Sequence, residues 1–244
     1  MEKINTVVVG YGGMGKYHAD NIAKFENFNL VGIYDIKEER CELARENNVK
    51  VYESFEAVLA DESIELIVCA TYNDCHKDIA IRAMKAGKNV ISEKPVTMCS
   101  ADLAEMIKAS EETGKLFTVH QNRRWDNDYR TIKNIIDKNE LGKVFAIDSR
   151  VYGSRGIPGD WRQEKEHGGG MVFDWGVHLL DQILMINEGK TIESVYATVT
   201  HITNDECDDG FRTLIKFKDG PDCVVEVLTN NFIEAPRWYV CGEN

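Results

Sequence analysis

Short apolar runs alternate with longer segments of helical periodicity in the first half of the chain. The apolar runs predict five strands, at residues 4–9, 30–34, 66–70, 89–91 and 117–119. Helices are predicted between them, at residues 14–25, 38–47, 55–59, 75–86 and 101–113. The strands are short and apolar enough to be covered on both faces, which is typical of parallel sheets built from βαβ units. We therefore expect a parallel sheet up to about residue 119.

The pattern changes after about Arg124. Helices are predicted at residues 129–137 and 171–186, and strands at residues 144–152, 194–203, 212–217, 223–229 and 238–241. Turn signals such as Lys218-Asp219-Gly220 indicate antiparallel pairing. The prediction is an α/β chain with a Rossmann dinucleotide-binding domain over residues 1–122 and an α+β domain with a mainly antiparallel open sheet over residues 123–244. The last residues resemble the start of another element, so we expect this sheet to be incomplete.

Composition narrows the possible partners. The 244 residues include 41 acidic and 29 basic side chains, which give a formal charge of -12. Such a field repels phosphate backbones and anionic headgroups, so we expect neither nucleic acid nor a membrane as partner. The sequence shows no signal segment and no apolar run of about 20 residues, which favours a cytoplasmic protein. Seven cysteines without C-x-x-C spacing predict neither a disulfide framework nor a metal site.

A glycine-rich motif follows the first predicted strand and opens the first predicted helix. The residues are Gly10-Tyr11-Gly12-Gly13-Met14-Gly15, a G-x-G-x-x-G pattern. In such a motif the first glycine permits a tight turn, the second lets backbone approach a pyrophosphate, and the third lets helix and strand pack closely. The alternative is a glycine turn required only for packing.

Asp35 ends the second predicted strand, 20 residues beyond Gly15. A carboxylate at that position would bind the adenosine ribose, and it would repel a 2′-phosphate. The predicted cofactor is therefore NAD. Lys37 is a nearby basic residue that keeps NADP as the alternative.

Three motifs together resemble the Gfo/Idh/MocA oxidoreductases. They are the glycine motif, Glu93-Lys94-Pro95, and Gly168-Gly169-Gly170 leading to Asp174 and His178. Residues 120–126, with Asp208-Asp209 and Phe211, look most like the branch that includes scyllo-inositol dehydrogenases. The resemblance implies a Rossmann domain joined to an antiparallel-sheet domain, and oxidation of a ring alcohol or reduction of the ketone. Family members usually continue beyond the segment that matches residues 238–244, so this chain looks shortened.

Hydride transfer from a carbinol carbon needs a base for the hydroxyl proton and a donor for the developing oxyanion. Lys94 follows a predicted strand, and the resemblance implies that it hydrogen-bonds the reacting hydroxyl. Asp174 and His178 are four residues apart, with Asp181 three further, so all three share a face of an otherwise apolar helix. We interpret His178 as the general base and Asp174 as a substrate ligand. The alternatives are a surface lysine and a structural histidine held by the two carboxylates.

Other positions are expected to complete the site. His18, on the first predicted helix, is a possible neighbour of the cofactor. Further cofactor contacts are expected from the resemblance at Thr71, Asn73, His76, Glu93, Lys94 and Asn122. Planar donors and aromatic faces suit a polyol, and we expect them at Arg123, Arg124, Trp161 and Arg162. Trp161 is equally suited to packing.

The leading function is an NAD-dependent dehydrogenase of a sugar, cyclitol or glycoside. One alternative is a glycoside-processing enzyme that uses bound NAD transiently, and another is a non-catalytic NAD-binding sensor of the same fold. The helices after Arg124 are too few to cover both faces of the second sheet. We therefore expect a homodimer or homotetramer.

Overall fold

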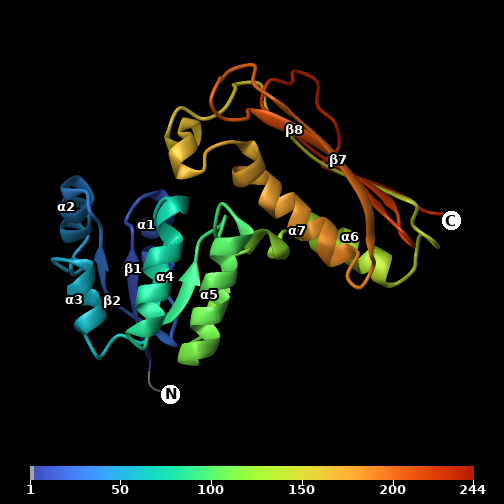
Figure 1. The fold of residues 1–244 in the computed structure, drawn as a ribbon. Helices are drawn as coiled ribbons and strands as arrows, with labels where there is room; N and C mark the ends of the chain where they lie inside the picture. Colours follow the sequence, from blue (N-terminus) through green and yellow to red (C-terminus); the bar gives the residue numbers. More distant parts are fainter. Residues whose placement is uncertain (1–2) are drawn as a thin grey trace. The chain divides into compact units, whose positions relative to one another are not determined.

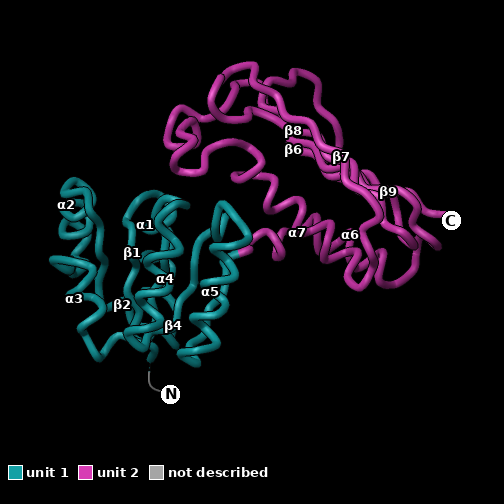
Figure 2. The backbone as a smooth tube through the Cα atoms, viewed as in Figure 1, with its two compact units in different colours: residues 1–120 teal, residues 121–244 magenta. Residues whose placement is uncertain are grey.

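The computed structural model describes residues 3–244, which form two compact units (Figures 1 and 2). The first unit comprises residues 1–120 and the second comprises residues 121–244. This division falls two residues before the end of the predicted first domain. Each unit has its own sheet and its own buried apolar cluster. In residues 3–244, no helix is long and apolar enough to cross a bilayer.

Unit 1 contains the predicted parallel sheet, with the strand order β2-β1-β3-β4-β5. Its strands are β1 (Ile4–Val9), β2 (Phe28–Tyr34), β3 (Leu66–Cys69), β4 (Asn89–Ser92) and β5 (Phe117–Val119). The chain adds β2 on one side of β1 and β3 on the other. In open α/β sheets, ligands bind at the carboxyl ends of the strands beside such a reversal. The topology therefore predicts ligand binding at the carboxyl ends of β1 and β3.

Helices cover both faces of this sheet (Figure 1). Successive residues of β1 point to opposite faces and pack against different helices. The helices are α1 (Gly13–Ile22), α2 (Glu38–Glu46), α3 (Phe55–Ala60), α4 (His76–Lys85) and α5 (Ser100–Thr113). Val7 and Val9 belong to a cluster with residues of α3, α4 and α5. Val8 points to the other face and packs with residues of α1 and α2. Both faces of β1 are buried, as its continuous apolar run predicts.

Unit 2 contains a five-stranded sheet with the order β10-β6-β9-β8-β7. Its strands are β6 (Ala146–Tyr152), β7 (Ile192–Thr200), β8 (Gly210–Phe217), β9 (Asp222–Leu228) and β10 (Trp238–Cys241). All neighbours are antiparallel except β6 and β9, which run parallel. The prediction of a mainly antiparallel open sheet is confirmed.

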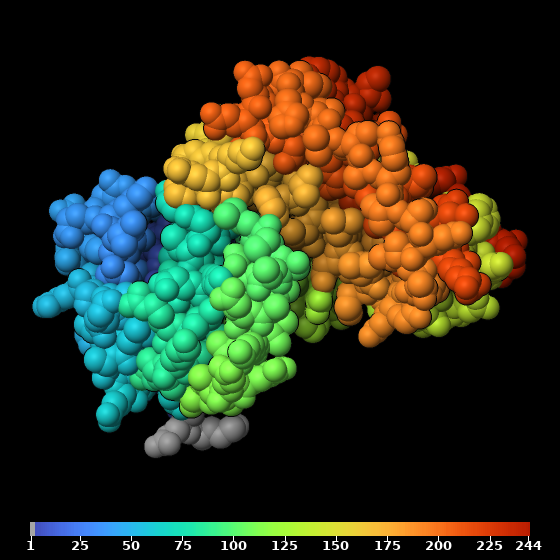
Figure 3. Space-filling model, in the orientation of Figure 1, coloured from blue at the N-terminus to red at the C-terminus, as the bar shows by residue number. Residues whose placement is uncertain are grey.

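One face of the second sheet packs against helices and the other is exposed. The inner cluster joins residues of α6 (Asn127–Asp137) and α7 (Val177–Ile186) to alternate residues of β8 and β9. Tyr196, Leu214, Val224, Asp148 and Tyr239 form a cross-strand row that includes the outward-facing Leu214. Tyr196 is 70% exposed. The segment that includes β7 is also at the surface in the space-filling view (Figure 3).

The predicted helix over residues 171–186 is not uniform. Residues Val172–Gly176 form a π-helical turn, and α7 continues from Val177 to Ile186. The backbone N–H of Val172 donates to Asp208 Oδ2 at 2.9 Å, and the N–H of Met171 donates to the Asp208 carbonyl at 3.0 Å. Asp208 therefore anchors the start of the segment. A π turn adds one residue to a helical turn and is frequent at functional sites.

Candidate active site

The candidate residues of unit 1 each follow the end of a parallel strand. Gly10 follows β1, Asp35 follows β2, Glu93 follows β4 and His120 follows β5, while Thr71 lies two residues beyond β3. Because the carboxyl ends of parallel strands share one edge of the sheet, these residues gather at that edge. The predicted placement of Lys94, directly after Glu93, follows from the same topology.

The glycine motif forms a close-packed turn followed by an open helix start. Gly10 has a φ of +90°, and a Cβ there would lie 2.4 Å from the Ala70 carbonyl oxygen. A Cβ on Gly15 would lie 1.8 Å from the Gly10 carbonyl oxygen. Gly12 caps α1 without a side-chain cap hydrogen bond, and the nearest atom to a Cβ there would be Arg40 Nη1 at 3.7 Å. Backbone N–H groups at such an open helix start bind phosphate, so the residues present fit a dinucleotide.

Asp35 is held beside this turn by two backbone donors. The N–H of Tyr11 donates to Oδ2 at 2.6 Å, and the N–H of Lys37 donates to Oδ1 at 2.8 Å. Each oxygen retains acceptor capacity for a ribose hydroxyl. Lys37 Nζ donates to the Tyr72 hydroxyl at 3.2 Å. Arg40 lies near the turn, with Nη1 at 3.5 Å from the Tyr11 carbonyl, and it was not predicted as a site residue.

Three predicted cofactor residues lie on the segment after β3. Thr71 and Asn73 precede α4, and Asn73 is buried. His76 is fully buried at the start of α4, with Nδ1 at 2.9 Å from the Pro95 carbonyl and Nε2 at 3.3 Å from the Thr71 carbonyl. Burial lowers the pKa of His76, which favours the neutral imidazole. This ring braces the backbone after β3 against the backbone after β4.

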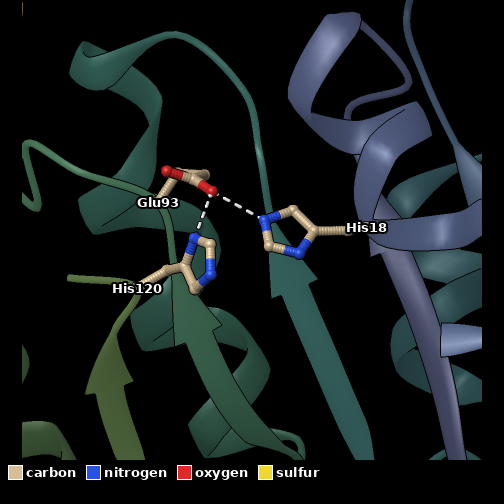
Figure 4. Close-up of side chains that lie close together, drawn as sticks. All are labelled: His18, Glu93 and His120. Atoms are coloured by element: carbon tan, nitrogen blue, oxygen red, sulfur yellow. Dashed lines mark hydrogen bonds and ion pairs between the residues drawn. The ribbon is translucent and has the colours of Figure 1, made fainter. Parts of the chain in front are cut away.

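Glu93 lies between two imidazoles (Figure 4). His18 Nε2 is 2.6 Å and His120 Nδ1 is 2.9 Å from Glu93 Oε1. Burial alone would raise the pKa of Glu93, but the hydrogen bonds from His120 and His18 outweigh it and hold the pKa well below its usual range. The other oxygen, Oε2, accepts the backbone N–H of Lys94 at 3.1 Å. The Lys94–Pro95 bond is cis, and Lys94 is partly exposed.

In unit 2, Asp174 lies in the π turn and pairs with Arg162. Arg162 Nε donates to Asp174 Oδ2 at 2.9 Å, while Arg162 Nη1 donates to Asp160 Oδ2 at 2.8 Å. Burial would lower the pKa of Arg162, but the hydrogen bond to Asp174 and the charges of both carboxylates outweigh it and raise that pKa. The guanidinium also lies over the Trp161 ring, 4.8 Å from its centroid. The predicted substrate ligands Asp174, Arg162 and Trp161 are therefore adjacent.

His178 begins the second turn of this segment and is buried. Its Nδ1 lies 3.3 Å from Gln121 Oε1. An amide oxygen only accepts, so Nδ1 carries the proton when this hydrogen bond forms, and Nε2 then carries the lone pair that a base requires. Gln121 was not predicted as a site residue. No spacing rule indicates it, because it lies 57 residues before His178 in the sequence.

The other predicted residues of unit 2 surround the short turn Asn122–Trp125. Arg124 makes a bidentate pair with Asp181, with Nε to Oδ2 at 2.7 Å and Nη2 to Oδ1 at 2.6 Å. Arg123 lies 4.0 Å from the Trp175 ring centroid, and Asn122 is exposed. Arg124 occupies both carboxylate oxygens of Asp181, so this carboxylate belongs to an ion pair at the surface of α7.

Two family models together match almost the whole chain. Residues 4–121 match the GFO_IDH_MocA model, described as an oxidoreductase family with an NAD-binding Rossmann fold. Residues 129–244 match the model of the GFO/IDH/MocA C-terminal domain. The chain belongs to the Gfo/Idh/MocA oxidoreductase family. The predicted family and its NAD-binding fold are confirmed.

Solved structures of two other proteins are similar to this chain over nearly its whole length. An NAD-binding protein from Listeria innocua is 49% identical with a TM-score of 0.96, and the match covers 99% of this chain and 71% of that chain. GenD2 from gentamicin A biosynthesis, solved in complex with NAD, is 25% identical with a TM-score of 0.89, covering 100% of this chain and 71% of that chain.

A curated relative adds a substrate name at lower identity. The scyllo-inositol 2-dehydrogenase (NADP(+)) IolW from Bacillus subtilis is 29% identical over 75% of this chain and 52% of the relative. The chain spans about half the length of the first curated relatives that it matches.

Proposed function

We propose that this chain is an NAD-dependent oxidoreductase that transfers a hydride between nicotinamide and a ring hydroxyl or ketone of a sugar, cyclitol or glycoside. The observation that carries the proposal is the buried pair of Asp174 and His178 on one π–α segment of unit 2, with Gln121 orienting the imidazole. A buried polar pair in a family of oxidoreductases is better explained by proton transfer than by packing. The name of IolW supports a cyclitol or related ring as substrate.

In this proposal the cofactor occupies the carboxyl edge of the unit 1 sheet. The turn from Gly10 to Gly15, including Tyr11, Gly13 and Met14, holds the pyrophosphate, and Asp35 holds the adenosine ribose. When bound, NAD supplies the hydride acceptor. The further proposed cofactor residues are Thr71, Asn73, His76, Glu93, Lys94 and Asn122. Of these, the buried His76 acts through the backbone that it contacts after β3 and β4. NADP is the second candidate, with Lys37 and Arg40 as nearby cations.

Three side chains are proposed to act on the substrate. The reacting hydroxyl gives its proton to His178 Nε2 as the carbinol carbon loses a hydride, which leaves a ketone. The Lys94 ammonium donates a hydrogen bond to the oxygen as its negative charge develops. Asp174 accepts a hydrogen bond from a second hydroxyl, and its pairing with Arg162 fixes the carboxylate. The proposal requires Lys94 and His178 to act on the same carbon during turnover.

The roles of Arg123, Arg124, Trp161 and Arg162 in substrate binding are part of the same proposal. Arg162 and Trp161 adjoin Asp174 and offer donors and an aromatic face to a ring with several hydroxyls. Arg124 is engaged by Asp181, and Arg123 lies over Trp175. These two arginines therefore contribute by shaping the turn that precedes α6.

The test is NADH formation on a panel of cyclitols, sugars and glycosides. Lys94→Ala and His178→Asn should each lower turnover by at least about 100-fold, the low end for positioned proton transfer, while NAD affinity stays within about 2-fold. His201→Asn, which changes an exposed histidine of unit 2, is the matched control and should leave turnover unchanged. Melting temperature is measured on the same samples.

Other outcomes separate the alternatives. A lower melting temperature with normal turnover of the folded fraction would make His178 structural and overturn its role as base. Cleavage of a glycoside without net NADH would identify transient use of NAD. Tight NAD binding without turnover of any member of the panel would favour a sensor.

A further inference from the structure

Two imidazoles and one carboxylate converge at the carboxyl edge of the unit 1 sheet (Figure 4). His18 comes from α1, Glu93 follows β4 and His120 follows β5. His18 Nε2 and His120 Nδ1 lie 2.6 and 2.9 Å from the same carboxylate oxygen, Glu93 Oε1. All three ligand atoms lie within 4.8 Å of one another. Three separate parts of the fold thus each place one donor atom in the same cluster.

We propose that His18, Glu93 and His120 form a binding site for one divalent transition metal ion of the zinc class. Two imidazole nitrogens and one carboxylate oxygen are a donor set that zinc accepts, with a fourth position left for water. Bonds of about 2.0–2.2 Å in a tetrahedron separate the ligand atoms by roughly 3.3 Å. The two Glu93 contacts observed here are somewhat shorter, so each imidazole nitrogen must move away from Glu93 Oε1 by only about half an ångström to admit the ion. The two imidazole nitrogens lie within 4.8 Å of each other.

The protons of the two imidazole rings can move between ring nitrogens without a change in the charge of either ring. In the hydrogen-bonded form, each imidazole directs an N–H toward Glu93 Oε1. A metal requires a lone pair on that nitrogen, and a neutral imidazole provides it when its proton moves to the other ring nitrogen. The proton then resides on His18 Nδ1 and on His120 Nε2. The site therefore exchanges two hydrogen bonds for three metal bonds, two from the rings and one from Glu93 Oε1, with the same ring charges before and after.

Burial and access both suit a specific site. The Glu93 side chain is 7% exposed, so its negative charge lies in a region of low dielectric where a cation is strongly attracted. The Lys94 N–H fixes the second carboxylate oxygen at 3.1 Å and so orients the first. The His120 side chain is 29% exposed, which leaves an entry for a hydrated ion.

A second group provides a natural comparison within the chain. Glu164, Glu166 and His167 also lie within ligand distance of one another, but they come from one short stretch of sequence and their carboxylates are exposed. The His167 Nε2 distances to these carboxylates are 3.5 and 3.9 Å. Exposed carboxylates remain hydrated and adjustable, so this second group should bind metal weakly.

The experiment is a titration of the chelator-treated full chain with Co²⁺, followed by visible absorption, in the absence of NAD and substrate. We expect one equivalent of Co²⁺ to bind with the visible bands of a four- or five-coordinate ion and without a thiolate charge-transfer band. Zn²⁺ should displace it. The absence of the thiolate band excludes the seven free cysteines as ligands.

Two variants test the assignment without removing the local hydrogen bonds. His18→Gln and His120→Asn keep an N–H donor for Glu93 but replace imidazole by an amide, a poor zinc ligand. Each should weaken Co²⁺ binding by more than about 10-fold while the melting temperature of the metal-free protein changes little. His167→Asn is the matched control and should leave Co²⁺ affinity unchanged.

Three results would overturn the site. They are a titration without visible bands, binding that His120→Asn and His18→Gln leave intact, and binding that His167→Asn abolishes. The measurement involves no turnover, so a failed metal site would leave the proposed dehydrogenase function untouched, and an inactive dehydrogenase would leave the metal site testable.

Discussion

The two units position their candidate residues by different means. In unit 1, Asp35, Glu93 and His120 directly follow strands of one parallel sheet, so the topology alone brings them to one edge. In unit 2, the partners come from irregular segments, as when Arg162 reaches Asp174 across 12 residues and Gln121 reaches His178 across 57. A residue at the end of a regular strand is therefore placed by the sheet topology, whereas a residue in an irregular segment is placed by its individual contacts.

The same contrast applies to stability. The turn after β1 depends on the absence of side chains, because a Cβ on Gly10 or Gly15 would overlap backbone. The π turn of unit 2 depends on ion pairs and on carboxylates that accept backbone N–H groups, such as Asp208. Substitutions in unit 1 should therefore act through steric overlap, and those in unit 2 through charge and pH.

The largest effect on stability and on NAD affinity is expected from Gly15→Ala. Its Cβ would lie 1.8 Å from the Gly10 carbonyl oxygen, so helix and strand must separate. We expect a loss of about 1–3 kcal/mol in the free energy of unfolding and a large fall in NAD affinity. Gly13→Ala is the control for the free energy of unfolding, because no atom beyond its chain neighbours and its own helix backbone lies within 4 Å of its Cβ position. Urea unfolding measures the free energy of unfolding of both variants, and calorimetry measures the NAD affinity of Gly15→Ala. Equal losses of unfolding free energy in the two variants would contradict the steric account of unit 1.

The second prediction compares the stability contributions of the two carboxylates that bind Arg162. The Asp174 side chain is 10% exposed and that of Asp160 is 46% exposed. Asp174→Asn should cost about 1–3 kcal/mol of unfolding free energy, because it removes a buried charge from a hydrogen-bonded pair. Asp160→Asn should cost about 0–1 kcal/mol, as is usual for an exposed pair. Urea unfolding at neutral pH gives both values, and a larger cost for Asp160→Asn would contradict the assignment.

The third prediction concerns acid sensitivity in unit 2. Burial would raise the pKa of Asp209, but hydrogen bonds from Thr203, Thr200 and Ile202 outweigh it and lower that pKa. The stabilisation is therefore present above the unfolded value of about 3.9 and is lost as pH falls through the folded pKa. Asp209→Asn should reduce the loss of unfolding free energy at acid pH. Urea unfolding at a series of pH values measures this loss.

Asp208 provides the control, because its pKa is shifted in the opposite direction to that of Asp209. Burial raises the pKa of Asp208, so ionising this group costs stability as pH rises through its ordinary range. Asp208→Asn keeps an oxygen for the Val172 N–H and removes that cost. Identical pH profiles for the two variants would show that these shifts do not govern the acid response.

The smallest effect on the fold is expected at the outer face of the second sheet. Tyr196 and Leu214 are cross-strand neighbours, and both are exposed. If this face covers a second copy, as the sequence predicts, Tyr196→Glu with Leu214→Glu should convert a homodimer or homotetramer to monomers. The free energy of unfolding of the monomer should change by only about 0.5 kcal/mol. Light scattering measures the mass. A monomeric wild-type protein at micromolar concentration would contradict the prediction that a second copy covers this face.

Most of the fold could be predicted because hydrophobic period and glycine position are local signals. The five strands of unit 1, the strands of unit 2 and the turn from Gly10 to Gly15 are examples. The pairing of Glu93 with His18 and His120 was missed, because these residues lie 75 and 27 positions away and no ligand-spacing rule applies. The π turn was missed because its five residues continue the helical pattern on both sides.

The geometry at the π turn also depends on the number of residues in the segment. Deleting one residue from Val172–Gly176 would restore a regular α-helix and rotate everything before it by about 100° relative to α7. The start of the segment is tied to Asp208 through the N–H groups of Met171 and Val172, so the rotation would either break these ties or move Asp174 away from Arg162. Insertions and deletions of single residues should therefore be tolerated less well here than substitutions. A homologue that lacks the extra residue should place its counterparts of Asp174 and Arg162 differently.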